Sequence, residues 1–130
     1  MSVIAAGRMR WALAVGAAAL CLAGGAAPAS AGGSSKPKIV SVADFYFGPN
    51  AVTVAKGGKI KWVWAPTNVE SHDVHLKKGP KGLKDKASYS TKTTAVTNAT
   101  FTHAFPTPGT YNFICTIHPT KMKLTVTVKK

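Results

Sequence analysis

The feature that most limits the fold of this chain is the alternation of apolar and polar residues in short segments separated by glycine and proline. The segments "KIKWVWA" (59–65) and "KLTVTVK" (123–129) place large apolar residues at every second position. A β-strand with one buried face has this period of two. The other segments of this kind are "KIVSVADFYF", "AVTVA", "HDVHLK", "ATFTHAF" and "TYNFIC". No useful helical period follows residue 31, so we expect an all-β sandwich or barrel of seven to eight short strands.

The first 31 residues have the three parts of a secretory signal. Two arginines, Arg8 and Arg10, precede an uncharged apolar run at 11–27, and "ASA" at 29–31 offers small residues for cleavage. A retained membrane anchor is the alternative, although the run is only about long enough to span a bilayer. We expect residues 1–31 to be a cleaved signal, 32–37 a flexible leader and 38–130 the folded domain. The protein would then be exported to a periplasm, a cell envelope or the extracellular space.

Cleavage after residue 31 changes the composition of the chain. It removes both arginines and Cys21, leaving 99 of the 130 residues, 15 lysines against four carboxylates, and a formal net charge of +11. A domain of this size can bury a sufficient core without disulfides. Cys115 is then a lone thiol in an oxidising compartment, where it is a liability unless something occupies it. Nucleic acid is a poor partner despite the charge, because no arginine and no recognised nucleic-acid module remain.

The stretch "YNFICTIHPTKMKLTVTV" carries three side chains that bind soft metals. Cys115 ends one expected strand, His118 lies in the connection, and Met122 begins the next strand. A fourth ligand should come from another strand end, and His72 in "ESHDVHL" is placed to supply it. Two imidazoles, one thiolate and a weak axial thioether suit copper. Zinc is a poorer match, because structural zinc sites usually hold several cysteines and thioether binds zinc weakly.

These segments, in this order, resemble the cupredoxins, the small blue copper proteins of the plastocyanin, amicyanin and pseudoazurin kind. The resemblance rests on "VTVAKGGKIKWVWA", "SHDVHL" and "PGTYNFICTIHP" and covers the chain after residue 31. It implies a Greek-key β-sandwich and one type 1 copper ion held by His72, Cys115, His118 and Met122. It also implies a monomeric carrier that moves single electrons by Cu(I)/Cu(II) cycling and is not an enzyme. A protein that delivers copper within the cell envelope is the alternative.

Two positions between the expected ligands depart from the family pattern. Asp73 stands where plastocyanin and amicyanin commonly have asparagine, and we expect its carboxylate to accept hydrogen bonds from Thr116. Ile117 stands where these relatives have proline, so it keeps its backbone N–H. We expect the N–H groups of Asp73 and Ile117 to donate to the sulfur of Cys115. Hydrogen bonds to a metal-bound thiolate raise the reduction potential.

We expect two kinds of residue to meet redox partners. An apolar rim of Ile117, Pro119 and Pro49 would surround an exposed edge of His118, the electron port. A lysine-rich segment would steer the protein towards an acidic redox partner or an anionic polymer of the cell envelope. Its lysines are Lys77, Lys78, Lys81, Lys84 and Lys86. We expect His75 and His103 to be ordinary strand histidines on the solvated side.

Overall fold

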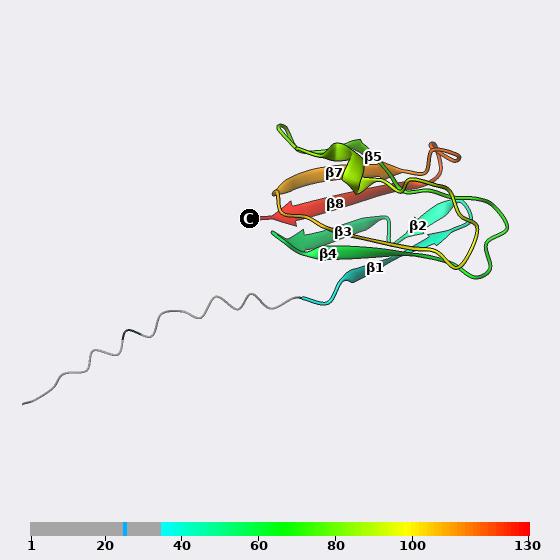
Figure 1. Ribbon diagram of the computed structural model, residues 1–130, viewed down its shortest axis with the longest axis horizontal. Coiled ribbons are helices and arrows are strands. Elements are labelled where there is room, and N and C mark those ends of the chain that lie inside the picture. The colour runs from blue at the N-terminus through cyan, green and yellow to red at the C-terminus, as the bar shows by residue number, and fades with distance from the viewer. Residues whose placement is uncertain (1–24, 26–34) are drawn as a thin grey trace, which may run out of the picture. The chain divides into compact units, whose positions relative to one another are not determined.

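The computed structural model describes residue 25 and residues 35–130, and it confirms an all-β domain (Figure 1). The expected signal segment, 1–31, lies outside the described residues apart from residue 25. No helix among the described residues is long and apolar enough to cross a membrane. The strands are β1 (Lys38–Ala43), β2 (Tyr46–Gly48), β3 (Ala51–Ala55), β4 (Lys59–Trp64), β5 (His75–Lys78), β6 (Thr100–Ala104), β7 (Gly109–Ile114) and β8 (Lys123–Lys129).

Eight strands form two four-stranded sheets that pack as a Greek-key sandwich. One sheet has the order β2-β1-β4-β6 and the other has the order β3-β8-β7-β5. Most neighbours are antiparallel, but β1 runs parallel to β4 and β3 runs parallel to β8. The two sheets pack face to face, so that each sheet covers the apolar face of the other, as in other β-sandwiches.

Alternation in the sequence explains which residues form the core. In β8 the buried residues Leu124, Val126 and Val128 alternate with exposed lysine and threonine. In β4 the buried residues are Ile60, Trp62 and Trp64, so both tryptophans face inward, as the sequence predicts. Aromatic rings fill the space between the sheets, with Trp62 contacting the rings of Phe101, Phe105 and Phe113.

The register of the strands defines two ends of the sandwich. At one end, which we call the Cys115 pole, β7 stops and β8 begins. At the opposite end, which we call the far pole, β1 and β4 begin together and β8 finishes beside the end of β3. Six residues of β7 separate the two poles, which corresponds to about 20 Å at the usual strand rise.

Three local details differ from the sequence-based expectation. The first expected strand, 38–47, is two strands, because Asp44 and Phe45 form a turn at the Cys115 pole. The irregular segment 79–99 contains one short 3-10 helix, η1 (Lys86–Tyr89). The prediction for His103 was wrong: its ring is partly buried and lies 3.9 Å from the ring of Tyr89, centroid to centroid. His75, by contrast, is exposed as predicted.

Candidate metal centre

The loop between β7 and β8 is closed by its own backbone. The N–H of Cys115 donates to the carbonyl of Met122 at 3.2 Å, and the N–H of Met122 donates to the carbonyl of His118 at 2.9 Å. The N–H of Lys121 also donates to the carbonyl of His118, at 3.2 Å. These bonds fix the spacing of the three metal-capable residues that the loop carries.

His72 reaches the same pole from a different part of the chain. Its backbone forms an isolated antiparallel bridge with Ala95, with N–H to carbonyl distances of 2.9 and 3.0 Å. The indole N–H of Trp64 also donates to the carbonyl of His72, at 3.2 Å. The side chain of His72 is fully buried, so its position is set by the packed interior on all sides.

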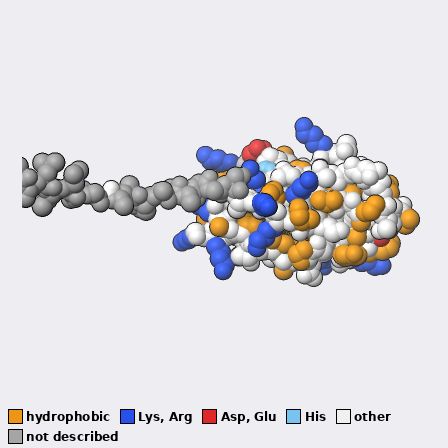
Figure 2. Space-filling view, turned by 90° about the horizontal axis from the view of Figure 1, so that it is seen from below, with side chains coloured by type: hydrophobic (Ala, Val, Ile, Leu, Met, Phe, Trp, Pro, Cys, Tyr) orange, Lys and Arg blue, Asp and Glu red, His pale blue; other side chains and the backbone are white. Residues whose placement is uncertain are grey.

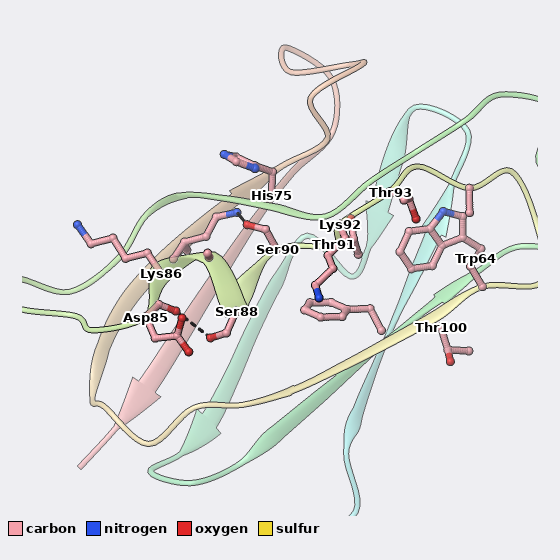
Figure 3. A pocket seen from close by; sticks show the side chains of 15 residues that line it. Trp64, His75, Asp85, Lys86, Ser88, Ser90, Thr91, Lys92, Thr93 and Thr100 are labelled. Carbon is pink, nitrogen blue, oxygen red and sulfur yellow. Dashed lines mark hydrogen bonds between the residues drawn. The ribbon is translucent and has the colours of Figure 1, made fainter.

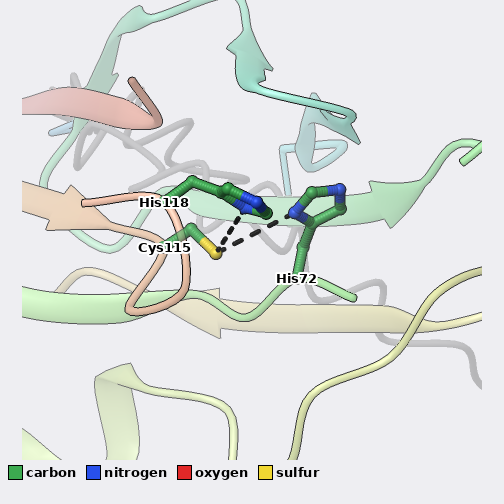
Figure 4. Close-up of side chains that lie close together, drawn as sticks. All are labelled: His72, Cys115 and His118. Atoms are coloured by element: carbon green, nitrogen blue, oxygen red, sulfur yellow. Dashed lines mark hydrogen bonds between the residues drawn. The ribbon is translucent and has the colours of Figure 1, made fainter. Parts of the chain in front are cut away.

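The structure brings three of the four expected ligands together (Figure 4). The sulfur of Cys115 lies 3.9 Å from Nδ1 of His72 and 3.9 Å from Nδ1 of His118. All three candidate ligand atoms lie within 4.8 Å of one another. Typical bond lengths of first-row metals are about 2.3 Å to sulfur and about 2.05 Å to nitrogen, which at 120° puts these atoms about 3.8 Å apart. The sulfur and nitrogen atoms therefore already have the separation of a trigonal metal site.

Met122 is fully buried beside this cluster. It directly precedes β8, and its backbone bonds to both Cys115 and His118. Cys115 is also fully buried and is the one free cysteine among the described residues. A buried thiol next to two imidazoles and a thioether is the donor set that copper prefers.

Asp44 completes the site, and the sequence analysis did not identify it. Its Oδ1 lies 2.8 Å from Nε2 of His72, the ring nitrogen that faces away from the sulfur. The same carboxylate accepts the backbone N–H groups of Val69 at 2.9 Å and Glu70 at 3.2 Å. Asp44 therefore ties the turn after β1 to the segment that leads into His72.

This hydrogen bond selects one tautomer of the His72 ring. The pKa of Asp44 is held below its usual range, chiefly by the hydrogen bond with His72 and then by the N–H of Val69, while partial burial acts in the opposite direction. An ionised carboxylate can only accept, so Nε2 carries the proton. Nδ1 is left with a free lone pair that points towards Cys115. Carboxylate partners of this kind commonly orient metal-binding histidines.

Phe45 is a second residue that the sequence analysis missed. Its ring meets the ring of His118 edge-on at 5.1 Å, and the ammonium of Lys121 lies 4.9 Å from the Phe45 ring centroid. Phe45 adopts a φ of +69°, which is uncommon for a large side chain. The turn therefore accepts a strained backbone and places an aromatic ring, 44% exposed, over the partly exposed imidazole of His118.

The expected partner of Asp73 is present. Its Oδ1 accepts the backbone N–H of Thr116 at 2.7 Å, and its Oδ2 accepts the Thr116 hydroxyl. These bonds link the segment after His72 to the loop after Cys115. The expected N–H donors to the sulfur, from Asp73 and Ile117, are not among its contacts; within residues 35–130 the sulfur has the two imidazoles as polar neighbours. No contact therefore supports a special effect of Ile117 on the reduction potential.

The predicted docking residues do not form one surface. Ile117, 44% exposed, and Pro119 flank His118 at the Cys115 pole. Pro49 is exposed in the connection to β3, where Asn50 bonds to Thr125. The predicted docking lysines lie farther from this pole. Lys77 and Lys78 lie on β5. Lys81 and Lys84 lie in the loop after Pro80, and Pro80 packs against Gly109 at the far pole. Lys86 begins η1.

A groove of about 1110 Å³ lies between β5, η1 and β6 (Figure 3). Trp64, Leu76, Ala99 and Phe101 supply part of its apolar wall. None of the four expected ligands lines it. We assign no function to this groove.

Comparisons with known proteins show the family of the chain. The profile described as copper binding proteins, plastocyanin/azurin family, matches residues 37–129. Amicyanin-alpha of Methylorubrum extorquens is 34% identical over 110 residues, which is 83% of this chain and 86% of the relative. The solved plastocyanin of Dryopteris crassirhizoma is 28% identical, with a TM-score of 0.59 over 70% of this chain and 99% of that one.

A larger protein shares the fold. The copper-containing nitrite reductase of Thermus scotoductus SA-01 is 22% identical, with a TM-score of 0.58 over 72% of this chain. The chain spans only 22% of the length of that enzyme. At this identity the likeness shows the fold alone.

Proposed function

Because the chain belongs to the plastocyanin/azurin family of copper-binding proteins, we propose that it carries single electrons between redox partners, using one type 1 copper ion. Cys115, His72, His118 and Met122 would hold the ion. The observation that carries this proposal is the placement of the Cys115 sulfur 3.9 Å from each imidazole Nδ1. When bound, copper supplies the one-electron Cu(I)/Cu(II) couple.

The chain contributes a fixed and dry set of donors. Cys115, His72 and Met122 are fully buried, so water does not reach these three side chains. The ligand positions are fixed by backbone hydrogen bonds and by Asp44, and a site that does not rearrange needs little reorganisation when the charge changes. His118 is partly exposed between Phe45 and Ile117, so its ring edge is the route for electrons to and from a partner.

A protein that delivers copper within the cell envelope is the second candidate. The exposed position of His118 favours it, because an incoming ligand could reach the ion on that side. Burial of the other three candidates disfavours rapid release. An enzyme is a weaker candidate, since residues 35–130 hold one metal-capable cluster.

We propose that the protein is exported and acts as a monomer. The signal-like residues 1–31 support export. Partners would be redox proteins that dock on the rim around His118, where Ile117 and Pro119 are exposed. An acidic partner surface could meet the ammonium of Lys121, which lies over the ring of Phe45 at this rim.

Two measurements test this proposal. Copper(II) added to the purified protein should give the intense blue of a thiolate-to-copper charge transfer, and Cys115→Ser should abolish it. A colourless product would exclude a type 1 site. Stopped-flow oxidation by a cytochrome, compared with copper transfer to a copper-free acceptor, then separates the candidates: an electron carrier exchanges electrons quickly and keeps its copper, whereas a delivery protein does the reverse.

A further inference from the structure

Eight of the fifteen lysines in residues 35–130 lie at the far pole. The starts of β1 and β4 are paired there, as are the ends of β3 and β8. The loop after β5 joins them, because Pro80 packs against Gly109, the residue paired with Val128. Four separate parts of the chain therefore bring lysines to one end of the sandwich. These lysines are Lys36, Lys38, Lys56, Lys59, Lys81, Lys84, Lys129 and Lys130.

All eight are exposed, and few carboxylates oppose them. Of the four acids in the described residues, Asp44, Glu70 and Asp73 belong to segments at the Cys115 pole. Only Asp85 is near the far pole, where it faces His103. About 20 Å separates the poles, which exceeds the screening length of about 8 Å at physiological salt. The acids of the Cys115 pole therefore do not neutralise the lysines of the far pole. On the face shown in Figure 2, most of the blue lysine side chains lie towards the left end of the domain.

A redox partner gains nothing by docking at the far pole. The Cys115 cluster lies at the other end of β7, and electron tunnelling weakens steeply with distance. The lysines also form a cap over one end of the sandwich instead of a groove or a single stripe. A cap of this shape fits an extended flat anionic surface better than one strand of a polymer.

We propose that the far pole binds an anionic lipid bilayer and leaves the Cys115 pole facing the solution. Lysines close to an anionic leaflet each contribute to binding. The bilayer would hold the protein near membrane-bound redox proteins with its electron port free, an advantage that rests on the proposed electron-carrying function.

The first test measures binding to lipid vesicles. The purified protein, with its first residue identified by mass spectrometry, is sedimented with vesicles of phosphatidylcholine alone and with vesicles containing phosphatidylglycerol. The difference in binding between the two is the measured quantity. It should be large at low salt and should fall as salt rises. Absence of a difference would overturn the proposal, as would binding to soluble polyphosphate without binding to anionic vesicles.

Two variants with the same charge change separate position from net charge. Replacing Lys56, Lys59, Lys81 and Lys84 by Glu should weaken vesicle binding by at least about 100-fold, since each lysine contributes roughly fivefold. The matched control replaces Lys77, Lys78, Lys121 and Lys123 by Glu and should weaken binding less than about tenfold. Equal losses would mean that net charge alone governs binding and would refute a far-pole surface. Neither binding measurement needs copper, so both stand if the redox function fails.

Orientation is tested on the copper-loaded protein. A soluble one-electron oxidant with no net charge, which the anionic lipid does not repel, should oxidise Cu(I) to Cu(II) and itself be reduced at the same rate for free and vesicle-bound protein. A rate that drops more than about fivefold on vesicle binding would place the Cys115 pole against the lipid and would overturn the proposed orientation.

Discussion

Replacing Asp44 by asparagine tests whether the carboxylate beside His72 tunes the metal site. One oxygen of Asp44 accepts from the His72 ring at 2.8 Å and from the Glu70 N–H, and the other accepts from the Val69 N–H at 2.9 Å. An asparagine has only one oxygen, and its amide group is a donor. The variant must therefore either lose the bond to His72 or face the N–H of Val69 with another donor.

The expected result is weaker copper binding. Substitutions of such outer partners typically cost 10- to 100-fold in metal affinity. The affinity for Cu(II) should fall more than the affinity for Cu(I), because an imidazole without its carboxylate partner is a weaker donor. The reduction potential should therefore rise. Competition with a chelator in each oxidation state gives both affinities, and protein-film voltammetry gives the potential.

Glu70→Gln is the matched control for this experiment. Glu70 is exposed at the same pole, and its carboxylate makes no hydrogen bond within residues 35–130, so the substitution changes the charge equally without changing a contact to His72. If the two variants have the same Cu(II) affinity within about twofold, then Asp44 acts only through its charge. The proposed selection of the His72 tautomer would then be refuted.

Three further variants test the packing of the sandwich. Burial lowers the pKa of His103 and Asp85 offsets this only in part, so copper-free protein should lose stability as the pH falls below the ordinary histidine value of about 6.5. His103→Gln should reduce that loss of stability, measured as the difference between the urea unfolding midpoints at pH 7.5 and 5.0. An identical difference in the variant would show that His103 is not the group responsible. Gly109→Ala places a Cβ 2.6 Å from a Pro80 carbon at a φ of +137°, so it should cost about 2 kcal/mol in chemical unfolding; a neutral result would mean that the loop after β5 moves freely. Asn68→Ala removes a buried side-chain amide whose NH2 group donates to two backbone carbonyls at 2.9 and 3.0 Å, and it should lower the free energy of unfolding by about 1–3 kcal/mol. A stabilised variant would show that burial of the unpartnered Oδ1 of Asn68 costs more than these two hydrogen bonds contribute.

The fold could be predicted from the sequence because its signals are local. The period of two in β4 and β8 indicates which side chains face inward, and glycine and proline mark the turns. The loop from Cys115 to Met122 could also be recognised, since its three metal-capable residues lie within eight positions. Local spacing therefore carried both the architecture and most of the candidate site.

The contacts of Asp44 could not be predicted in the same way. It meets His72 across 28 positions, and this contact depends on how the turn after β1 packs beside the segment before β5. Nothing near Asp44 in the sequence indicates a metal site. The only available hint was that acids are scarce in a chain with so many lysines.

The lysine-rich segment illustrates a second limit. Lys77 and Lys81 are close in sequence, but β5 runs away from the Cys115 pole and Pro80 packs against Gly109, so Lys81 lies farther from the electron port than Lys77. A count of charges along the chain cannot reveal this direction. The pairing of β5 with β7 shows which of these lysines lie near the electron port and which lie towards the far pole.

The way His72 is held has a consequence for folding kinetics. Its backbone and ring depend on Asp44, Trp64 and Ala95, which come from three distant parts of the chain. Contacts of such long range form slowly, because loop closure must precede them. The loop from Cys115 to Met122 is local and can form early. A newly folding chain would thus present a partial, weak copper site first, and tight capture of the ion would mark the completion of the sandwich.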